Sequence, residues 1–303
     1  MKSPLPYVGG KWTCLPHIEP RLPLKSQKFV EPFGGGANII LYRKRANIEI
    51  YNDIDNQVFN FFHVVKFLPH SFNVRLDLLN HCSPQNFKML TEIVYGNPNY
   101  DDYLKLELES AEKLFEGEQL EIVKRELDEK FRFSNVDKAV AYLLLKKMSY
   151  ASNGKTYMPT KVNAETVKIE VQRTSARLLD IALENRDFRK VLKSHDGKDA
   201  FFYIDPPYFG TERMYTNIFG LIDHEDLFKI LGSLEGKFLL SYNDCEFIRK
   251  MAKKYGFYIY AYERPNSIAL KYDKDNKFPE ILVANYDMDE MMYQNTKQIS
   301  MLI

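Results

Sequence analysis

The tetrapeptide Asp205-Pro206-Pro207-Tyr208 holds the residue types best suited to chemistry in this chain. It follows the apolar run Ala200-Phe201-Phe202-Tyr203-Ile204, which is typical of a buried strand in a parallel sheet. The Asp205 carboxylate is therefore expected at the strand's C-terminal end, where open α/β sheets bind ligands. The two prolines remove backbone N–H donors and stiffen the turn. An acid, accepting carbonyls and an aromatic ring together predict a pocket for a planar group that bears an NH₂.

Each residue of this turn has an expected role. Asp205 and the carbonyl of Pro206 would accept the two hydrogens of an exocyclic amine, which directs the nitrogen lone pair toward an electrophile. Tyr208 would stack on the ring. Such catalysis works by positioning and requires neither a metal nor a covalent nucleophile. The six histidines show no metal-ligand spacing, so we predict no metal site.

A glycine-rich turn, Phe33-Gly34-Gly35-Gly36, follows a strand predicted over 28–33. It allows the backbone to approach a ligand closely, but it fits neither G-x-G-x-x-G nor a P-loop, and a simple tight βα turn is the structural alternative. Asp53 follows the next predicted strand at about the spacing of an acid that grips a ribose diol, or else it caps a helix. Without a pyrophosphate fingerprint, the pair predicts a nucleoside cofactor rather than a dinucleotide.

Two further segments give weaker signals. Gly9-Gly10-Lys11 could bring a cation and backbone amides to a carboxylate or phosphate, or it could be a mobile terminus. Asp187 and Phe188 pair an acid with an aromatic ring near the end of a strand. They could hold an adenine ring, although a surface loop explains them equally well.

The elements that must position these residues alternate between strand and helix. A βαβα start and a later α/β stretch flank a charged helical region, which predicts an α/β doubly wound sheet with an insertion. We expect strands at 28–33, 48–52, 200–204, 237–242, 257–262 and 280–286. We expect helices at 37–45, 54–67, 104–131 with a break at Gly117, 136–148 after a cap at Ser134 or Asn135, 167–182, 224–234 and 246–255. The last strand follows no crossover helix, so we expect it to be antiparallel to its neighbour.

The domain division follows from these elements. Residues 1–67 and 162–290 form the predicted catalytic domain, 68–161 the inserted lobe with a turn at Asn153-Gly154, and 291–303 a tail.

Composition narrows the class of protein only slightly. The 303 residues are 45% hydrophobic, 27% charged and 14% aromatic, which is typical of a globular protein with rings for a core or for base stacking. A net charge of +1 does not favour a nucleic-acid binder, although a local basic face would suffice. We find no apolar stretch long enough for a membrane span, no signal-like start and no CxxC pair, and we therefore expect a cytoplasmic protein.

Taken together, the motifs resemble the Dam-type DNA adenine-N6 methyltransferases, the D12 class, in the segment order of the alpha group. The resembling segments are 6–11, 29–36, 52–55, 205–208, 238–243 and 280–286. The resemblance implies a Rossmann-like S-adenosylmethionine-dependent methyltransferase sheet of seven strands with one reversed strand, plus an inserted, mostly helical target-recognition lobe. It implies methyl transfer from S-adenosyl-L-methionine to the N6 amino group of an adenine flipped out of duplex DNA.

The resemblance also implies residue roles. The target adenine would be held by Asp205, Pro206 and Tyr208. The cofactor would be bound by Tyr7, Lys11, Glu31, Phe33, Gly34, Gly35, Gly36, Asp53, Asp187, Phe188 and Asp205. The family's arginines around the Asn-Gly turn are largely missing, and lysines stand in for them. Our DNA-binding candidates, from that turn and from two later loops, are Asn153, Lys155, Lys161, Arg213, Tyr215, Arg264 and Lys271.

Other functions remain open at this point. The same pocket would serve methylation of cytosine N4, RNA adenine or a protein glutamine, and an inactive DNA-binding relative would keep the fold. The expected partners are double-stranded DNA and, for a site-specific methyltransferase, a paired restriction endonuclease. We expect no membrane association and a monomer or weak dimer. The sequence does not give the DNA recognition site.

Overall fold

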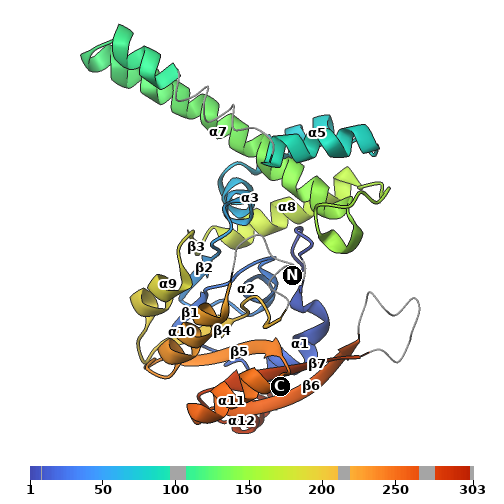
Figure 1. Ribbon diagram of the computed structural model, residues 1–303, viewed down its shortest axis with the longest axis vertical. Coiled ribbons are helices and arrows are strands. Elements are labelled where there is room, and N and C mark those ends of the chain that lie inside the picture. The colour runs from blue at the N-terminus through green and yellow to red at the C-terminus, as the bar shows by residue number, and fades with distance from the viewer. Residues whose placement is uncertain (8, 96–106, 211–218, 266–276, 301–303) are drawn as a thin grey trace. The chain divides into compact units, whose positions relative to one another are not determined.

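The computed structural model describes residues 1–7, 9–95, 107–210, 219–265 and 277–300 (Figure 1). The chain forms two compact units, one from residues 1–3, 9–59 and 177–303 and the other from 4–8 and 60–176. The boundaries between the units fall within α3 (Asn56–Phe67) and α8 (Ala164–Leu178). The division at 67/68 and 161/162 that the sequence suggests stays a prediction. No helix of the described residues is long and apolar enough to span a membrane.

The first unit contains a seven-stranded sheet in the order β3-β2-β1-β4-β5-β7-β6. Its strands are β1 (Lys28–Glu31), β2 (Ile48–Asn52), β3 (Ile181–Glu184), β4 (Ala200–Ile204), β5 (Lys237–Asn243), β6 (Tyr258–Pro265) and β7 (Lys277–Ala284). β7 pairs antiparallel with both β5 and β6, whereas the other neighbouring strands are parallel. The predicted α/β sheet with one reversed strand is confirmed.

Helices cover both faces of this sheet. The first unit's helices are η1 (Lys11–Cys14), α1 (Leu15–Ile18), η2 (Glu19–Arg21), α2 (Asn38–Tyr42), α9 (Phe188–His195), α10 (Leu221–Leu231), α11 (Glu246–Lys254) and α12 (Met288–Ser300). Phe202 and Leu240 share one buried cluster with Val191 of α9 and Leu227 of α10. On the opposite face the Phe29 and Phe201 rings stack 6.0 Å apart. A sheet buried on both faces explains the continuous apolar runs of its strands.

The sequence predictions for three segments are wrong or incomplete. The helix predicted over 167–182 ends at Leu178, and Ile181 begins β3, which pairs with β2. Its short apolar run fits a helical period equally well, so only the pairing reveals a strand. No helix was predicted where α9 lies. None was predicted in the tail either, where α12 extends as far as Ser300.

The second unit is helical. It contains α4 (Pro69–Leu79), α5 (Pro84–Tyr95), a helix at 107–114, α7 (Gly117–Lys147) and η3 (Tyr150–Ser152), and α7 packs on α4 and α5. The ion pair between Lys124 and Glu112, 3.1 Å apart, joins α7 to helix 107–114, which lies beside it in Figure 1. Gly117 has φ +57°, which confirms the predicted break there.

One predicted break in this unit is wrong. The structure continues α7 through Ser134 and Asn135 without a cap. Neither residue breaks a helix strongly, since each costs only a few tenths of a kcal/mol relative to the best helix formers. The apolar face of α7 packs on α4 and α5, and this packing keeps the helix continuous although the sequence contains residues that favour a helix cap.

Candidate active site

Four strands end at the edge of the sheet where the predicted site residues lie. β1 runs into the glycine turn, β2 into Asp53, β4 into Asp205, and β5 ends at Asn243. The strand order reverses between the adjacent strands β1 and β4. Open α/β sheets bind ligands at such a reversal, beyond the carboxyl ends of the strands. The topology therefore gathers these segments at one candidate site.

The centre of this site is an ion pair between Lys11 and Asp205. The Lys11 Nζ lies 2.7 Å from Asp205 Oδ1, and the two side chains are 5% and 21% exposed. Nζ also donates to the Gly9 carbonyl at 3.1 Å. Burial lowers the pKa of Lys11, but the Asp205 carboxylate together with Tyr208, Glu280 and Cys14 outweighs burial and raises this pKa well above its usual value. Burial raises the pKa of Asp205 to about 6 against the opposing effect of Lys11, so Asp205 is ionised at neutral pH.

Tyr208 is buried beside this pair. The Lys11 ammonium lies 4.7 Å from the centroid of its ring, and the Tyr242 ring stacks 5.7 Å away at 27°. The Tyr208 hydroxyl donates to Glu280 Oε2 at 3.1 Å and lies 3.3 Å from Ser241 Oγ. Burial raises the pKa of this hydroxyl well above its usual value, so it stays protonated and remains a donor.

Glu280 was not among the predicted site residues. It is fully buried on β7, and its Oε2 accepts from both the Tyr208 and the Tyr262 hydroxyls, the latter at 2.7 Å. Its Oε1 pairs with the Arg264 guanidinium. Burial acts to raise its pKa, but Lys11 and Arg264 outweigh burial and lower the pKa below its usual value. The one sequence signal for this residue is an acid that directly precedes the apolar run 281–284.

Arg264 was predicted to contact DNA. Here its guanidinium pairs with Glu280 and lies 4.9 Å from the centroid of the Phe278 ring. The Arg264 side chain therefore contacts two residues of β7. Its contact with DNA stays a prediction. Three other candidates, Arg213, Tyr215 and Lys271, lie outside the described residues.

The glycine turn is closed by contacts with β2 and with Asp53. A Cβ on Gly34 would lie 2.0 Å from the Tyr51 ring, so only glycine fits at this position. The Tyr51 hydroxyl donates to the Gly35 carbonyl at 2.8 Å, while the Gly35 N–H donates to Asp53 Oδ2 at 2.7 Å. The predicted turn, with Gly36 at its end, therefore forms.

Asp53 is a turn residue rather than a helix cap. Its second oxygen, Oδ1, accepts from the Asp55 N–H at 2.8 Å, and Asp55 in turn accepts from the Gln57 N–H at the start of α3. Burial raises the pKa of Asp53 to about 7 despite these two backbone donors. Each carboxylate oxygen keeps a second lone pair that could accept from another hydroxyl.

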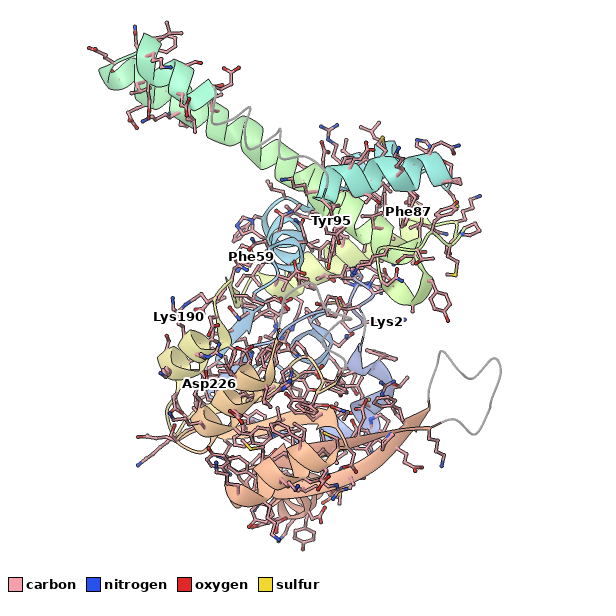
Figure 2. The ribbon with its side chains drawn as sticks, viewed as in Figure 1. Lys2, Phe59, Phe87, Tyr95, Lys190 and Asp226 are labelled. Atoms are coloured by element: carbon pink, nitrogen blue, oxygen red, sulfur yellow. The ribbon has the colours of Figure 1, made fainter. Side chains whose placement is uncertain are left out.

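Phe33 and Phe188, predicted from separate segments, lie together. Their rings are 5.1 Å apart, and both contact the Phe219 ring, at 5.7 Å and 5.6 Å. Asp187 caps α9 by accepting from the Arg189 N–H at 2.8 Å. The Arg189 side chain also donates to Asp226, labelled on α10 in Figure 2, at 2.8 Å. The structure thus provides an aromatic cluster with a carboxylate at its edge.

Two polar groups lie buried near the Lys11–Asp205 pair. Glu31, at the end of β1, accepts from the Ile40 N–H at 3.3 Å, and burial raises its pKa well above its usual value. The Tyr203 hydroxyl on β4 is buried and has no hydrogen-bond partner among the described residues. Buried polar groups are generally paired, so an unpartnered hydroxyl points to a water or a ligand atom. The sequence analysis did not single out Tyr203.

The remaining candidates lie in the second unit. The Tyr7 ring lies 5.6 Å from the Lys146 Nζ in that unit. The predicted turn at Asn153-Gly154 forms, because Asn153 Oδ1 accepts from the Lys155 and Thr156 N–H groups and Gly154 has φ +74°. Lys155 and Lys161 are exposed. The roles of these residues in binding cofactor or DNA stay predictions.

The arrangement of the first unit suits binding of an amine and a nucleoside-like group. A buried carboxylate already holds an N–H donor, and an aromatic cluster and a glycine turn lie at neighbouring strand ends. Within the described residues there is no group of three or more His, Cys, Asp or Glu side chains that could hold a metal ion.

Comparison with known proteins points to one chemistry. A family model described as D12 class N6 adenine-specific DNA methyltransferase matches residues 7–266. The type II methyltransferase M1.LlaDCHI of Lactococcus lactis subsp. cremoris is 26% identical over an alignment 303 residues long. The alignment covers 92% of this chain and 94% of that protein. Modification methylase StsI of Streptococcus sanguinis is 42% identical over 65 residues, covering 20% of this chain and 10% of that protein.

Proposed function

Because the chain belongs to the D12 class of N6 adenine-specific DNA methyltransferases, we propose that the Asp205 turn is where its target adenine reacts. The enzyme transfers a methyl group to adenine N6 in DNA. The names of its relatives, a type II methyltransferase and a modification methylase, agree with a restriction–modification context. We further infer duplex DNA as the substrate, a cytoplasmic location, a monomer or weak dimer, and a paired restriction endonuclease.

The observation that carries this proposal is the Lys11–Asp205 contact. Asp205 Oδ1 holds the Lys11 nitrogen at 2.7 Å. An adenine amino group is also an N–H donor, so it would replace the ammonium at this oxygen, with the Pro206 carbonyl as its second acceptor. Asp205 then holds the amine in place. It stabilises the positive charge that develops on N6 as the nitrogen donates its lone pair, and it can accept the proton that N6 loses.

Entry of the base requires two changes. The amino group lies inside the duplex, so the adenine must flip out, which costs a few kcal/mol. The Lys11 ammonium must also leave Asp205 and the neighbouring Tyr208 ring, 4.7 Å away. Tyr208 then stacks on the flipped base and recovers part of the cost.

We propose S-adenosyl-L-methionine as the methyl donor. When bound, it supplies an electrophilic methyl group. The residues present suit such a group, since Tyr203 has a buried hydroxyl with no hydrogen-bond partner among the described residues, and Gly34 lets the turn close against the Tyr51 ring. Asp53 would hold the ribose through its remaining lone pairs, and Phe33 and Phe188 would contact the adenine ring. Tyr7, Lys11, Glu31, Gly35, Gly36 and Asp187 complete the proposed cofactor site.

The proposal is tested by transfer of label from S-adenosyl-L-methionine to adenine-containing duplex DNA, with nucleoside analysis of the product. We expect N6-methyladenine, and we expect Asp205→Asn to lower kcat by roughly 10²–10³-fold, the usual cost of losing one site that stabilises developing charge. Asp244→Asn, which alters an acid at the end of β5 that pairs with Arg249, is the matched control and should stay near wild type.

Each other product would contradict the proposal. Label in N4-methylcytosine, in RNA or in a protein glutamine would identify another planar amine as the substrate. Cofactor binding without transfer to any of these would indicate an inactive relative. Mapping of N6-methyladenine in a host that lacks adenine methylation would identify the recognition sequence.

A further inference from the structure

Glu280 joins the catalytic turn to the reversed end of the sheet. It lies opposite Asn243 of β5 and opposite Tyr262 of β6, on the strand between them. Its Oε2 accepts from the hydroxyls of Tyr208 and Tyr262, and its Oε1 accepts from Arg264. A residue far from Asp205 in the sequence thus holds the aromatic member of the catalytic tetrapeptide.

The complete burial of the Glu280 carboxylate requires a physical explanation. An uncompensated buried charge is strongly unfavourable, and replacing a buried ion pair by apolar residues is often neutral or stabilising. Glu280 is fully buried, yet two hydroxyls and a guanidinium donate to it and the Cys14 Sγ lies 3.7 Å from Oε2. Such a saturated site fixes the direction of each donor, which an apolar side chain could not do.

We infer that Glu280 is a positioning residue that holds the Tyr208 ring in place for stacking on the flipped adenine. A tyrosine side chain has two soft torsions. Packing against Tyr242 restrains rotation of the ring plane, and the hydroxyl bond to Glu280 fixes the position of the far end of the ring. Displacement of a positioning group by about 1 Å can cost about a hundredfold in rate. The inference rests on the proposed role of Tyr208.

Arg264 has a defined part in this arrangement. Its guanidinium pairs with the Glu280 oxygen that does not bind Tyr208, which leaves Oε2 for the two hydroxyls. Together with Lys11, the residue predicted to contact DNA thereby lowers the pKa of Glu280 below its usual value. β6 consequently contributes to the geometry of the catalytic turn through Glu280, although no residue of the tetrapeptide belongs to it.

The test compares variants that each remove one interaction at Glu280. Tyr208→Phe and Tyr262→Phe each delete one hydroxyl that donates to the same oxygen. We expect Tyr208→Phe and Glu280→Gln each to lower the single-turnover rate on duplex DNA about tenfold or more, with KM for S-adenosyl-L-methionine within about twofold. Tyr262→Phe should lower the rate less than Tyr208→Phe does, because it leaves the Tyr208 bond in place.

The double variant decides whether Glu280 acts through Tyr208. In the Tyr208→Phe background, Glu280→Gln should cost less than about twofold further, since the bond it supports is already gone. A duplex with 2-aminopurine at the target position should show altered fluorescence in both single variants, because the probe reports base stacking after flipping.

Three results would overturn the inference. These are a wild-type rate for Glu280→Gln, multiplicative effects in the double variant, and equal losses from the two tyrosine variants. If Glu280→Gln unfolds, the two tyrosine variants still decide the question, since both keep the carboxylate. A wild-type enzyme that labels no DNA would instead overturn the proposed function.

Discussion

At the scale of single residues, the Lys11–Asp205 pair determines how the enzyme should respond to pH. Asp205 must be ionised to accept a hydrogen of the amine and to stabilise the positive charge that develops on the nitrogen. Burial raises its pKa to about 6, and Lys11 limits that rise. Raising the pH through this value removes the proton from the free enzyme, so kcat/KM for DNA at saturating cofactor should increase with pH along one ionisation near pH 6. The measurement is the pH–rate profile of methyl transfer.

The same pair predicts the behaviour of Lys11→Met. Removing the cation that lowers the Asp205 pKa leaves burial unopposed, so the ionisation should move to a pH above 6. Lys190→Met on α9, an exposed residue labelled in Figure 2, is the control and should leave the profile unchanged. An unmoved or lowered ionisation in Lys11→Met would show that Lys11 does not act on Asp205.

Residue types allowed part of this site to be predicted. Asp205, Gly34 and Asp53 follow apolar strands, so their sequence neighbours place them at the ligand-binding edge of the sheet. Glu280 was missed because its partners Tyr208 and Tyr262 belong to the turn after β4 and to β6. The local sequence pattern does not predict which strands lie next to one another. Tyr203 was missed because one polar group in a buried strand has no distinctive spacing.

At the scale of elements, the helical arm of the second unit, residues 107–127, carries the wrong charge for DNA. It contains seven glutamates against two lysines and one arginine. A phosphate backbone attracts cations and is repelled by such a surface. We therefore expect the recognition role predicted for the inserted lobe to belong to its other parts, such as the turn that bears Lys155 and the exposed Lys161.

Two charge-reversed pairs test this assignment. Lys155→Glu with Lys161→Glu should weaken DNA binding and reduce the slope of log affinity against log salt, by about one unit for each phosphate that the lysines no longer neutralise. Lys113→Glu with Arg125→Glu, which reverses the same charge on the arm, should leave both the affinity and the slope near wild type. Salt titrations of DNA affinity measure both. Equal losses from the two pairs would place the arm on DNA.

Elements differed in how well the sequence predicted them. Strands β2 and β4 form at their predicted bounds, because each is an apolar run closed by turn residues. α9 was missed because it is only eight residues long, which limits its buried apolar face to Phe188, Val191 and Leu192. β7 was predicted to be antiparallel because a polar stretch rather than a crossover helix precedes it, and it is.

At the scale of the whole chain, the C-terminal helix holds the N-terminal segment that bears Lys11. The Asn295 Nδ2 on α12 donates to the Pro20 carbonyl at 2.9 Å and to the Leu22 carbonyl at 2.8 Å. The Tyr286 hydroxyl donates to the Arg21 carbonyl between them at 2.6 Å. Three successive carbonyls after η1 and α1 are thereby satisfied by the opposite end of the chain, which explains why the tail folds.

Asn295→Ala should therefore destabilise the enzyme more than its place near the C-terminus suggests. Asn295 is buried, and its loss leaves two carbonyls without their donor, at about 1–3 kcal/mol for each unsatisfied buried group. We expect the free energy of unfolding in urea to fall by at least about 2 kcal/mol. Gln294→Ala removes the neighbouring exposed amide, which donates to Glu290 at 3.0 Å within the same helix, and should change stability by no more than about 0.5 kcal/mol. Equal, small losses from both variants would mean that α12 packs on the N-terminal segment without holding it.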